Sequence, residues 1–533
     1  MSSPVPLSLP EHFNAAEYFI DRHIGQGRSA KVAIECGELR MTFGQLYAMV
    51  NQVGNGLKNL GVRIEERVLL LLLDTPEFAA SFFGAIKIGA VPVPVNTLLK
   101  PGDYTYLLNN SRARVAIVSK SLLPLIQEVP QNELHFLECI VVVGDHSSAG
   151  EINFSELVQG GSAVLEPAPT GKDDAAFWLY SSGSTGVPKA CVHLQHDMVV
   201  STERYAKAIL KISERDRFFS VAKLFFAYGL GNGLYFPLAV GATSILLSGP
   251  PRPQSIFEVI QLHRPTLFFS VPSNYVKLLA HPAPGGEFDL SSIRHAVSAG
   301  EALPASVYHR FKERFGVEIL DALGSTEALH MLISNAPGEV RPGSSGKVLP
   351  GFEAKIVDDN DQAVAQGEIG NLIVKADSAC AYYWNEHEKT KNTIAGPWLR
   401  TGDKYLEDKD GYFWYAGRSD DMLKVSGVWV SPIEIERVLS EHPLVLEVAV
   451  IFRQDQDELF KPAACVVLRE GRSGTPQLAR ELQEFVVSRL PIFKRPHWVD
   501  FLPELPKTAT GKVQRYKLRD SSQPAIPRSE RSR

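Results

Sequence analysis

Short apolar runs alternate with amphipathic stretches over most of the first 400 residues. Such runs have the length of buried strands. They lie at Val68–Leu73, Val115–Val118, Ile140–Val143, Thr266–Val271 and from Ile319 onward. The residues from Phe78 to Ile88 carry apolar side chains at helical spacing and predict an amphipathic helix. Strands that alternate with helices in this way predict an α/β fold built from layered αβ subdomains.

The pattern changes twice along the chain. Turn residues punctuate short β-like stretches between 340 and 376, which predicts a smaller β subdomain that closes the large N-terminal domain (1–419). Mixed α and β patterns then follow from 420 to 520 and predict a small α+β domain. The Ser/Arg/Pro-rich tail, 521–533, is typical of disordered chain ends.

Composition and charge narrow the function classes. A chain of 533 residues is too long for one compact core and predicts two or more domains. A composition of 44% hydrophobic and 22% charged residues is typical of a soluble protein. A net charge of −5 without a large basic block argues against nucleic acid as a partner. The five cysteines are scattered and form no C-x-x-C pair, which fits a reducing cytoplasm and indicates neither a disulfide framework nor a zinc site. We read no signal peptide in Met1–Pro10, and the aliphatic run Val68–Leu73 is too short to span a membrane.

The decapeptide 180–189 holds the strongest chemical signal. It reads Tyr-Ser-Ser-Gly-Ser-Thr-Gly-Val-Pro-Lys and follows the apolar strand-like stretch from Ala175 to Tyr180. Its glycines let backbone N–H groups converge on an anion, while hydroxyls and a lysine add donors and charge. The spacing differs from that of a Walker loop. The predicted phosphate cradle consists of Ser181, Ser182, Gly183, Ser184, Thr185 and Lys189. The alternative is an ordinary flexible loop of small polar residues.

The whole string resembles the phosphate loop of the acyl-adenylate-forming superfamily, which includes acyl- and aryl-CoA ligases, amino-acid adenylation domains and luciferases. In that family the loop holds the β- and γ-phosphates of ATP. Four further motifs occur in the family's order, so that the resemblance spans about residues 42 to 517.

Residues 321–327, Asp-Ala-Leu-Gly-Ser-Thr-Glu, resemble the family's aromatic-Gly-x-Thr-Glu motif. The resemblance implies that Thr326 binds phosphate oxygen, that Glu327 carries Mg²⁺, and that Asp321 belongs to the nucleotide site. Leu323 replaces the usual aromatic residue, which puts adenine stacking there in doubt. The segment 298–304 resembles the opposite side of the adenine site, with Gly300 and Glu301. Taken alone, each string also fits an ordinary helix start.

Three motifs toward the C-terminus imply a ribose site and a moving domain. Asp403, in Trp-Leu-Arg-Thr-Gly-Asp, matches the family's acceptor of the ribose hydroxyls, and Arg418 matches a contact to ribose or phosphate. Asp420 aligns with the hinge of the C-terminal domain, and Gly427 with a residue that enters the active site for thioester formation. Lys512, in Pro-Lys-Thr-Ala-Thr-Gly-Lys, resembles the mobile lysine that contacts the carboxylate and the α-phosphate.

The stretch Phe225–Asn232 lies where the family builds its acyl pocket. It contains no acidic residue to pair an amino-acid ammonium group, so an uncharged acyl group is favoured. A bulky Tyr228 between Ala227 and Gly229 indicates a short, flat pocket. The resemblance adds Ala299, Gly324, His330 and Met331 as further walls. A packed aromatic core explains this stretch too, and His330 fits a core histidine equally well.

The motifs most resemble those of the aryl-CoA ligase branch, and within it the benzoate–CoA ligases. This implies a two-step enzyme that uses ATP, Mg²⁺ and coenzyme A to convert an aryl carboxylate to an aryl-AMP and then to a thioester. Hydroxy- or halobenzoates are rival substrates, because one ring substituent changes binding little unless a site group pairs with it. A stand-alone enzyme that loads a carrier protein and a non-catalytic acyl-AMP binder are the other classes. We expect small-molecule partners, no nucleic acid and no membrane, with a homodimer as one arrangement.

Overall fold

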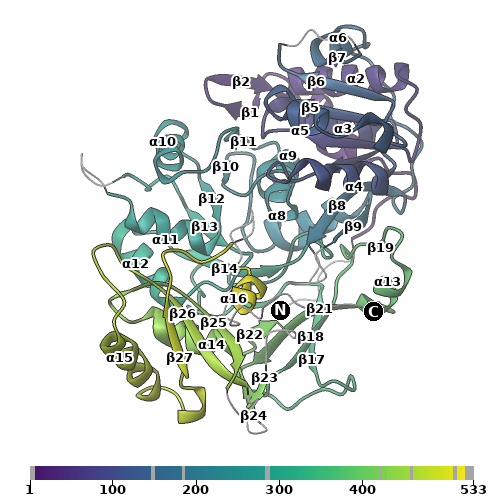
Figure 1. Ribbon diagram of the computed structural model, residues 1–533. Coiled ribbons are helices and arrows are strands. Elements are labelled where there is room, and N and C mark those ends of the chain that lie inside the picture. Colours follow the sequence, from purple (N-terminus) through teal and green to yellow (C-terminus); the bar gives the residue numbers. More distant parts are fainter. Residues whose placement is uncertain are drawn as a thin grey trace.

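The computed structural model describes residues 7–145, 150–182, 187–282, 288–418, 423–425, 428–455, 460–507 and 513–521. The described chain forms several sheets with helices packed around them and a smaller C-terminal unit, which confirms the predicted α/β class (Figure 1).

The first large sheet is parallel and five-stranded. Its order is β4 (Val91–Pro94), β3 (Arg67–Leu71), β5 (Val115–Ser119), β6 (Cys139–Val143) and β7 (Ile152–Asn153). Its helices are α2 (Phe43–Asn59), α3 (Pro76–Lys87), α4 (Pro101–Ser111), α5 (Leu123–Gln127) and α6 (Phe154–Gln159). The predicted helix over 78–88 is α3, which begins two residues earlier because Pro76 suits the first helical turn. The cap of α2 is a reciprocal pair of hydrogen bonds between Thr42 and Gln45.

The second large sheet has nine strands and carries one side of the site. Its order is β16 (Lys347–Val348), β15 (Met331–Ser334), β14 (Ile319–Gly324), β13 (His295–Ser298), β12 (Leu267–Ser270), β10 (Arg217–Ser220), β11 (Thr243–Leu246), β1 (Val32–Cys36) and β2 (Leu39–Thr42). The block from β14 to β1 is parallel, and helices α10 (Pro253–His263), α11 (Pro272–Ala280) and α12 (Ala305–Phe315) connect its strands. Because these strands are parallel, the loops after β12, β13 and β14 leave from one edge, where α/β sheets bind ligands.

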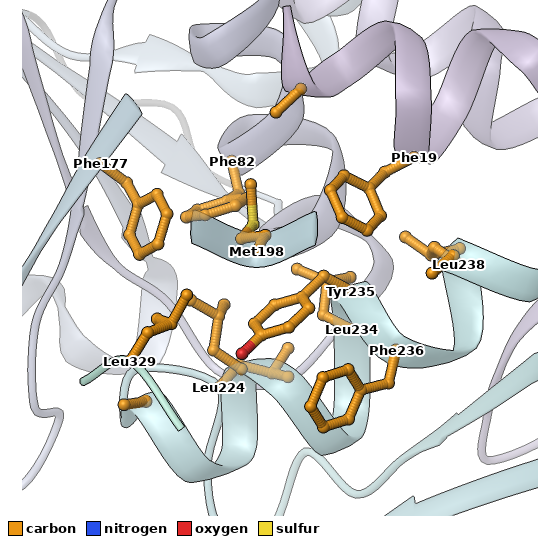
Figure 2. Close-up of a cluster of buried hydrophobic side chains, with 14 of the residues drawn as sticks. Phe19, Phe82, Phe177, Met198, Leu224, Leu234, Tyr235, Phe236, Leu238 and Leu329 are labelled. Atoms are coloured by element: carbon orange, nitrogen blue, oxygen red, sulfur yellow. The ribbon is translucent and has the colours of Figure 1, made fainter. Parts of the chain in front are cut away.

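A three-stranded sheet carries the segment predicted to be the phosphate loop. It consists of β19 (Tyr382–Tyr383), β9 (Pro188–Leu194) and β8 (Ala175–Ser182). The predicted strand at 175–180 is therefore confirmed, and Ser181 pairs with Lys189 across the hairpin. Figure 2 shows the buried core against this hairpin, where Phe177 of β8 lies beside Phe82 of α3, and Met198 and Tyr235 belong to the same cluster. This core fixes the hairpin to both large layers.

The predicted β subdomain is real and extends well beyond residue 376. It comprises β17 (Glu353–Val357), β18 (Gly370–Lys375), β20 (Ile394–Ala395), β21 (Trp398–Glu407) and β22 (Phe413–Arg418), with helix α13 (His387–Thr393) between β19 and β20. The sequence pattern does not predict β21 and β22, because their polar residues mask the alternation that is typical of a half-buried sheet.

The C-terminal unit is a small α+β structure, as predicted. Its elements are β23 (Leu423–Val425), β24 (Val428–Val430), α14 (Pro432–Ser440), β25 (Val445–Gln454), β26 (Phe460–Leu468), α15 (Pro476–Val487), β27 (Trp498–Phe501) and α16 (Arg515–Ser521). It lies against the β subdomain (Figure 1), where the Ser431 hydroxyl donates to the Ala416 carbonyl and Arg437 stacks 5.6 Å from the Trp414 ring centre. Among the described helices, none is long and apolar enough to cross a membrane.

Candidate active site

The turn between β14 and β15 holds Thr326 and Glu327, and donors from outside the turn hold three of its successive backbone carbonyls. The carbonyl of Thr326 accepts from Nε2 of His193 at 2.9 Å, and that of Glu327 from the amide of Cys380 at 2.6 Å. The carbonyl of Ala328 accepts from the Ser378 hydroxyl at 2.9 Å. The next residue, Leu329, has a φ of 67°, which is rare for a bulky side chain. Such strain persists where surrounding contacts over-determine the turn, as they do here.

The Glu327 carboxylate is held in a defined orientation. Its Oε1 accepts hydrogen bonds from the Tyr383 hydroxyl at 2.8 Å and the Ser181 hydroxyl at 3.1 Å. Burial and the adjacent Glu327 charge raise the pKa of Tyr383, so that this phenol keeps the proton it donates. Lys189 lies with its Nζ 4.4 Å from the centre of the Tyr383 ring. The structure thus brings Ser181, Lys189 and Glu327 together from three separate segments.

Several predicted residues lie outside what the structure describes. They are Gly183, Ser184 and Thr185 of the phosphate loop, Asp420 and Gly427 of the hinge region, and Lys512. Only the backbone of Ser182, at the end of β8, is described. The residue after Lys512 is described: the amide of Val513 donates to Oε1 of Glu301 at 3.2 Å. This contact joins the C-terminal unit to the predicted adenine side.

The predicted adenine side is formed by the carboxyl ends of β13 and β14. Asp321 is buried, and its Oδ2 accepts a hydrogen bond from the amide of Leu303 at 3.2 Å. Burial raises the pKa of Asp321 to about 8, because a carboxylate loses its hydration there. Gly300 has a φ of 94°, a left-handed conformation that suits glycine. Gly300, Glu301 and Asp321 therefore belong to one corner of the large sheet.

Asp403 and Arg418 face each other on neighbouring strands. Asp403 of β21 is in register with Arg418 of β22, and the guanidinium Nη1 lies 3.1 Å from Oδ1 of the carboxylate. Nη1 also donates to the carbonyl of Thr401 at 3.1 Å. In this arrangement the Asp403 carboxylate can accept from hydroxyl groups while the adjacent Arg418 guanidinium donates to phosphate oxygens.

Helix α8 (Ala227–Leu230) presents the predicted acyl-pocket residues. The Tyr228 hydroxyl lies 3.1 Å from the carbonyls of both Ser270 of β12 and Val297 of β13, so its one hydrogen can be donated to either and its ring is held in place. Ala227 is buried beside it. A Cβ at Gly229 would stand 2.1 Å from the carbonyl oxygen of Lys223, so a side chain does not fit there.

His330 packs among aromatic rings at the other side of Tyr228. Its ring centre is 4.6 Å from that of Phe236, 5.3 Å from Tyr205 and 5.8 Å from Tyr228. Burial lowers the pKa of His330 to about 3, so the imidazole is neutral. The ring is therefore a packed core group that also lies beside Tyr228, and its role as a wall of the acyl pocket stays a prediction.

The remaining predicted wall residues adjoin the same corner. Ala299, which follows β13, and Met331, at the start of β15, are buried. Gly324 ends β14, where an added Cβ would stand 2.5 Å from the carbonyl oxygen of His330 and 3.1 Å from Sδ of Met331. Together with α8 these residues outline an apolar, uncharged wall.

Two residues that contact the site were missed from the sequence. Tyr383 orients Glu327, and His193 holds the carbonyl of Thr326. Both lie far from Glu327 in the chain and in strands without a recognisable motif. The aromatic run Tyr382–Trp384 was the one local signal for Tyr383, and it fits ordinary packing equally well.

Known proteins match this chain over nearly its full length. The family model for AMP-binding enzymes matches residues 21–384, and the model for the C-terminal domain of AMP-binding enzymes matches residues 434–512. A benzoate–CoA ligase of Thauera aromatica is 47% identical over 98% of each chain. A 4-hydroxybenzoate–CoA/benzoate–CoA ligase of Rhodopseudomonas palustris is 43% identical over 97% of this chain and 96% of its own.

Solved structures of CoA ligases also superpose on this chain. The anthranilate CoA ligase AuaEII in complex with anthranoyl-AMP superposes with a TM-score of 0.92 at 44% identity, covering 96% of this chain and 98% of that one. A benzoate CoA ligase from Burkholderia xenovorans LB400 superposes with a TM-score of 0.88 at 44% identity, covering 95% of this chain and 100% of that one. Since matches of this extent include the turn around Glu327, the Asp403–Arg418 pair and the C-terminal unit, the chain belongs to the AMP-binding enzyme family.

Proposed function

We propose that this protein is an ATP-dependent aryl-acid–CoA ligase whose main substrate is benzoate. A carboxylate oxygen of the acid attacks the α-phosphorus of ATP, and pyrophosphate leaves to give benzoyl-AMP. The thiolate of CoA then attacks the carbonyl carbon, AMP leaves, and benzoyl-CoA forms. The observation that carries this proposal is the 47% identity to a benzoate–CoA ligase over nearly the full length of both chains.

The nucleotide would be held along the edge formed by the β8–β9 hairpin, the Glu327 turn and β21. Ser181, Thr326 and Lys189, with Ser182, Gly183, Ser184 and Thr185, would contact the β- and γ-phosphates. Gly300, Glu301 and Asp321 would line the adenine, while Asp403 and Arg418 would meet the ribose. An ion pair between an exposed arginine and one carboxylate contributes little free energy. Arg418 can therefore exchange its contact with Asp403 for a contact with a phosphate oxygen.

Glu327 fits the role of an Mg²⁺ ligand. Mg²⁺ is usually held by one or two carboxylates plus substrate phosphates, and the described residues contain no cluster of three metal-ligating side chains. The two hydroxyls on Oε1 of Glu327 orient the carboxylate for such a role. When bound, Mg²⁺ would neutralise charge on the phosphates during adenylation.

The two half-reactions would use two positions of the C-terminal domain, which we place at 420–520 after the N-terminal domain 1–419. In the first position Lys512 would contact the carboxylate and the α-phosphate. The Val513–Glu301 hydrogen bond supports this position, because it holds the residue after Lys512 at the adenine side. Rotation about Asp420 would then withdraw Lys512 and bring Gly427 to the thioester-forming site.

The acid would lie against Tyr228, between Ala227 and Gly229 on one side and Ala299, Gly324, His330 and Met331 on the other. A neutral His330 and an apolar wall suit a flat, uncharged ring. A hydroxy-, halo- or amino-substituted benzoate is the second candidate, because the anthranilate CoA ligase AuaEII superposes with a TM-score of 0.92.

The decisive experiment measures CoA-dependent AMP release with a panel of acids. The panel holds benzoate, hydroxy-, halo- and aminobenzoates, cinnamate, short fatty acids and amino acids. We expect benzoate to have the highest kcat/KM, and a substituted benzoate that exceeds it by tenfold would replace it as the assigned substrate. Carrier-bound pantetheine as the preferred acceptor would instead identify a loading enzyme. The same protein in gel filtration tests the homodimer.

A further inference from the structure

A buried histidine lies directly behind the predicted phosphate and metal turn. His193 of β9 has a fully buried side chain, and its ring is stacked on Phe177 at a centre distance of 5.2 Å. One ring nitrogen, Nε2, lies 2.9 Å from the carbonyl oxygen of Thr326, and the other, Nδ1, lies 2.8 Å from Oδ2 of Asp197.

The partners of His193 require a hydrogen on each side of its ring, because the Nδ1 and Asp197 Oδ2 lone pairs would repel at 2.8 Å without a hydrogen between them. A backbone carbonyl can only accept, so Nε2 must carry a hydrogen and donate it to Thr326. Oδ2 of Asp197 faces Nδ1 and also accepts from the amide of Leu194 at 3.1 Å. Asp197 is fully buried too. The carboxyl group is therefore anchored by the hairpin, and through Nδ1 it sets the orientation of the imidazole.

From this geometry we infer that His193 is a positioning residue for the Thr326–Glu327 turn. The amide of Cys380 and the hydroxyl of Ser378 hold the next two carbonyls, so His193 completes a row of three anchors. Of the three, it is the one whose own orientation depends on a buried carboxylate. Loss of its donor would leave the first carbonyl of the row with only the amide of Leu329, 3.1 Å away within the same turn, and would let the Thr326 hydroxyl and the Glu327 carboxylate shift relative to ATP and Mg²⁺. This inference rests on the proposed ATP site.

Two matched variants separate this role from simple packing. Glutamine places its side-chain NH₂ near the position of Nε2 and can still donate to Thr326. Asparagine places its NH₂ near the position of Nδ1, so that it keeps the hydrogen bond to Asp197 and loses the one to the carbonyl of Thr326. The first measurement is ATP–pyrophosphate exchange with benzoate at varied Mg²⁺. The second is single-turnover thioester formation from synthetic benzoyl-AMP.

We expect His193→Asn to lower the exchange rate about tenfold and to raise the Mg²⁺ concentration at half-saturation, as for the loss of one orienting hydrogen bond. Thioester formation should stay within about twofold, because that step needs neither Mg²⁺ nor pyrophosphate, and His193→Gln should retain most of the exchange. A control variant is His263→Asn on α10, since His263 is a buried histidine paired with Glu35 at 2.7 Å. It should leave the Mg²⁺ dependence unchanged even if it lowers the melting temperature.

Calorimetric binding of Mg·ATP without any acid keeps the test independent of the proposed substrate. A weaker Mg·ATP affinity in His193→Asn than in His193→Gln supports the role even if benzoate is not the substrate. Equal Mg·ATP affinities in wild type and His193→Asn would overturn it, and so would equal losses in both variants or in both half-reactions. Absence of AMP release with every acid would instead overturn the proposed function.

Discussion

The backbone amide of Val513 donates a hydrogen bond to Oε1 of Glu301, 3.2 Å away. These two residues are far apart in the chain and belong to the C-terminal unit and the large N-terminal domain. The contact therefore couples the position of the small domain to the loop after β13. It also gives this arrangement of the two domains a specific stabilising interaction that a substitution can remove.

Replacement of Glu301 tests this coupling. Glu301→Ala removes the acceptor and should slow adenylation by roughly 10- to 150-fold, because a hydrogen bond to a charged group contributes roughly 1.5–3 kcal/mol. Glu301→Gln keeps an acceptor and should stay within about threefold of wild type. The measurement is single-turnover formation of benzoyl-AMP. Thioester formation from benzoyl-AMP should be unchanged or faster, and an equal loss there would contradict the assignment of this contact to one domain position.

Lys512→Ala should slow adenylation by about 10²–10³-fold, the loss expected for one preorganised electrostatic donor. Rates of the two half-reactions, measured separately, are the readout, and thioester formation from benzoyl-AMP should be spared. Lys507→Ala is the control, since Lys507 belongs to the same segment and pairs with Glu447 at 2.6 Å within the C-terminal unit. Comparable losses in both half-reactions would exclude the two-position mechanism.

Tyr383→Phe should weaken the apparent affinity for Mg²⁺ in adenylation without affecting thioester formation. The variant removes the hydroxyl that donates to Glu327 at 2.8 Å, and we expect the Mg²⁺ concentration at half-saturation to rise about three- to tenfold. Tyr382→Phe serves as the neighbouring control, because Tyr382 is 40% exposed and lies next to Tyr383 on β19. If both variants behave alike, the Tyr383–Glu327 contact does not orient the metal ligand.

Gly229→Ala should destabilise the fold and reduce binding of the acid. A Cβ there would stand 2.1 Å from the carbonyl oxygen of Lys223, and backbone cannot move as a flexible side chain does. Overpacking of this kind costs roughly 1–3 kcal/mol. Gly102→Ala on α4 is a control with open space around its Cβ and should be neutral or slightly stabilising. Thermal unfolding and the KM for benzoate are the two measurements.

Asp321→Asn should change the pH dependence of stability. The folded state raises the pKa of Asp321 to about 8, so between about pH 4 and pH 8 the unfolded chain releases a proton that the folded chain keeps. Asp321 therefore destabilises the folded state, and this destabilisation grows as pH rises through this window. The melting temperature of the variant should exceed that of wild type increasingly from pH 5 to pH 8. A constant difference across this range would show that Asp321 titrates normally.

The sequence alone determined the fold class and the enzyme family of the protein, and it predicted a set of site residues. The runs at 68–73, 115–118, 140–143 and 266–271 correspond to β3, β5, β6 and β12, because buried parallel strands must be continuously apolar. The motifs around Glu327, Asp403 and Arg418 could be read locally, since each is a turn or strand end whose chemistry depends on adjacent residues. The β21–β22 strands were harder to see, because half-exposed strands carry polar residues on one face.

Only the tertiary structure decided which groups face one another. Tyr383 and His193 contact the Glu327 turn through pairings of β9 and β19 with a distant loop, and no local pattern encodes such a contact. The pKa of Asp321 and the neutral state of His330 likewise arise from burial by segments far away in the chain. The physical reason is that periodicity and turn chemistry act over a few residues, whereas desolvation and hydrogen-bond partners are set by how the layers pack. The sequence therefore predicted candidate site residues, and the packing determined the orientation and protonation of the described ones.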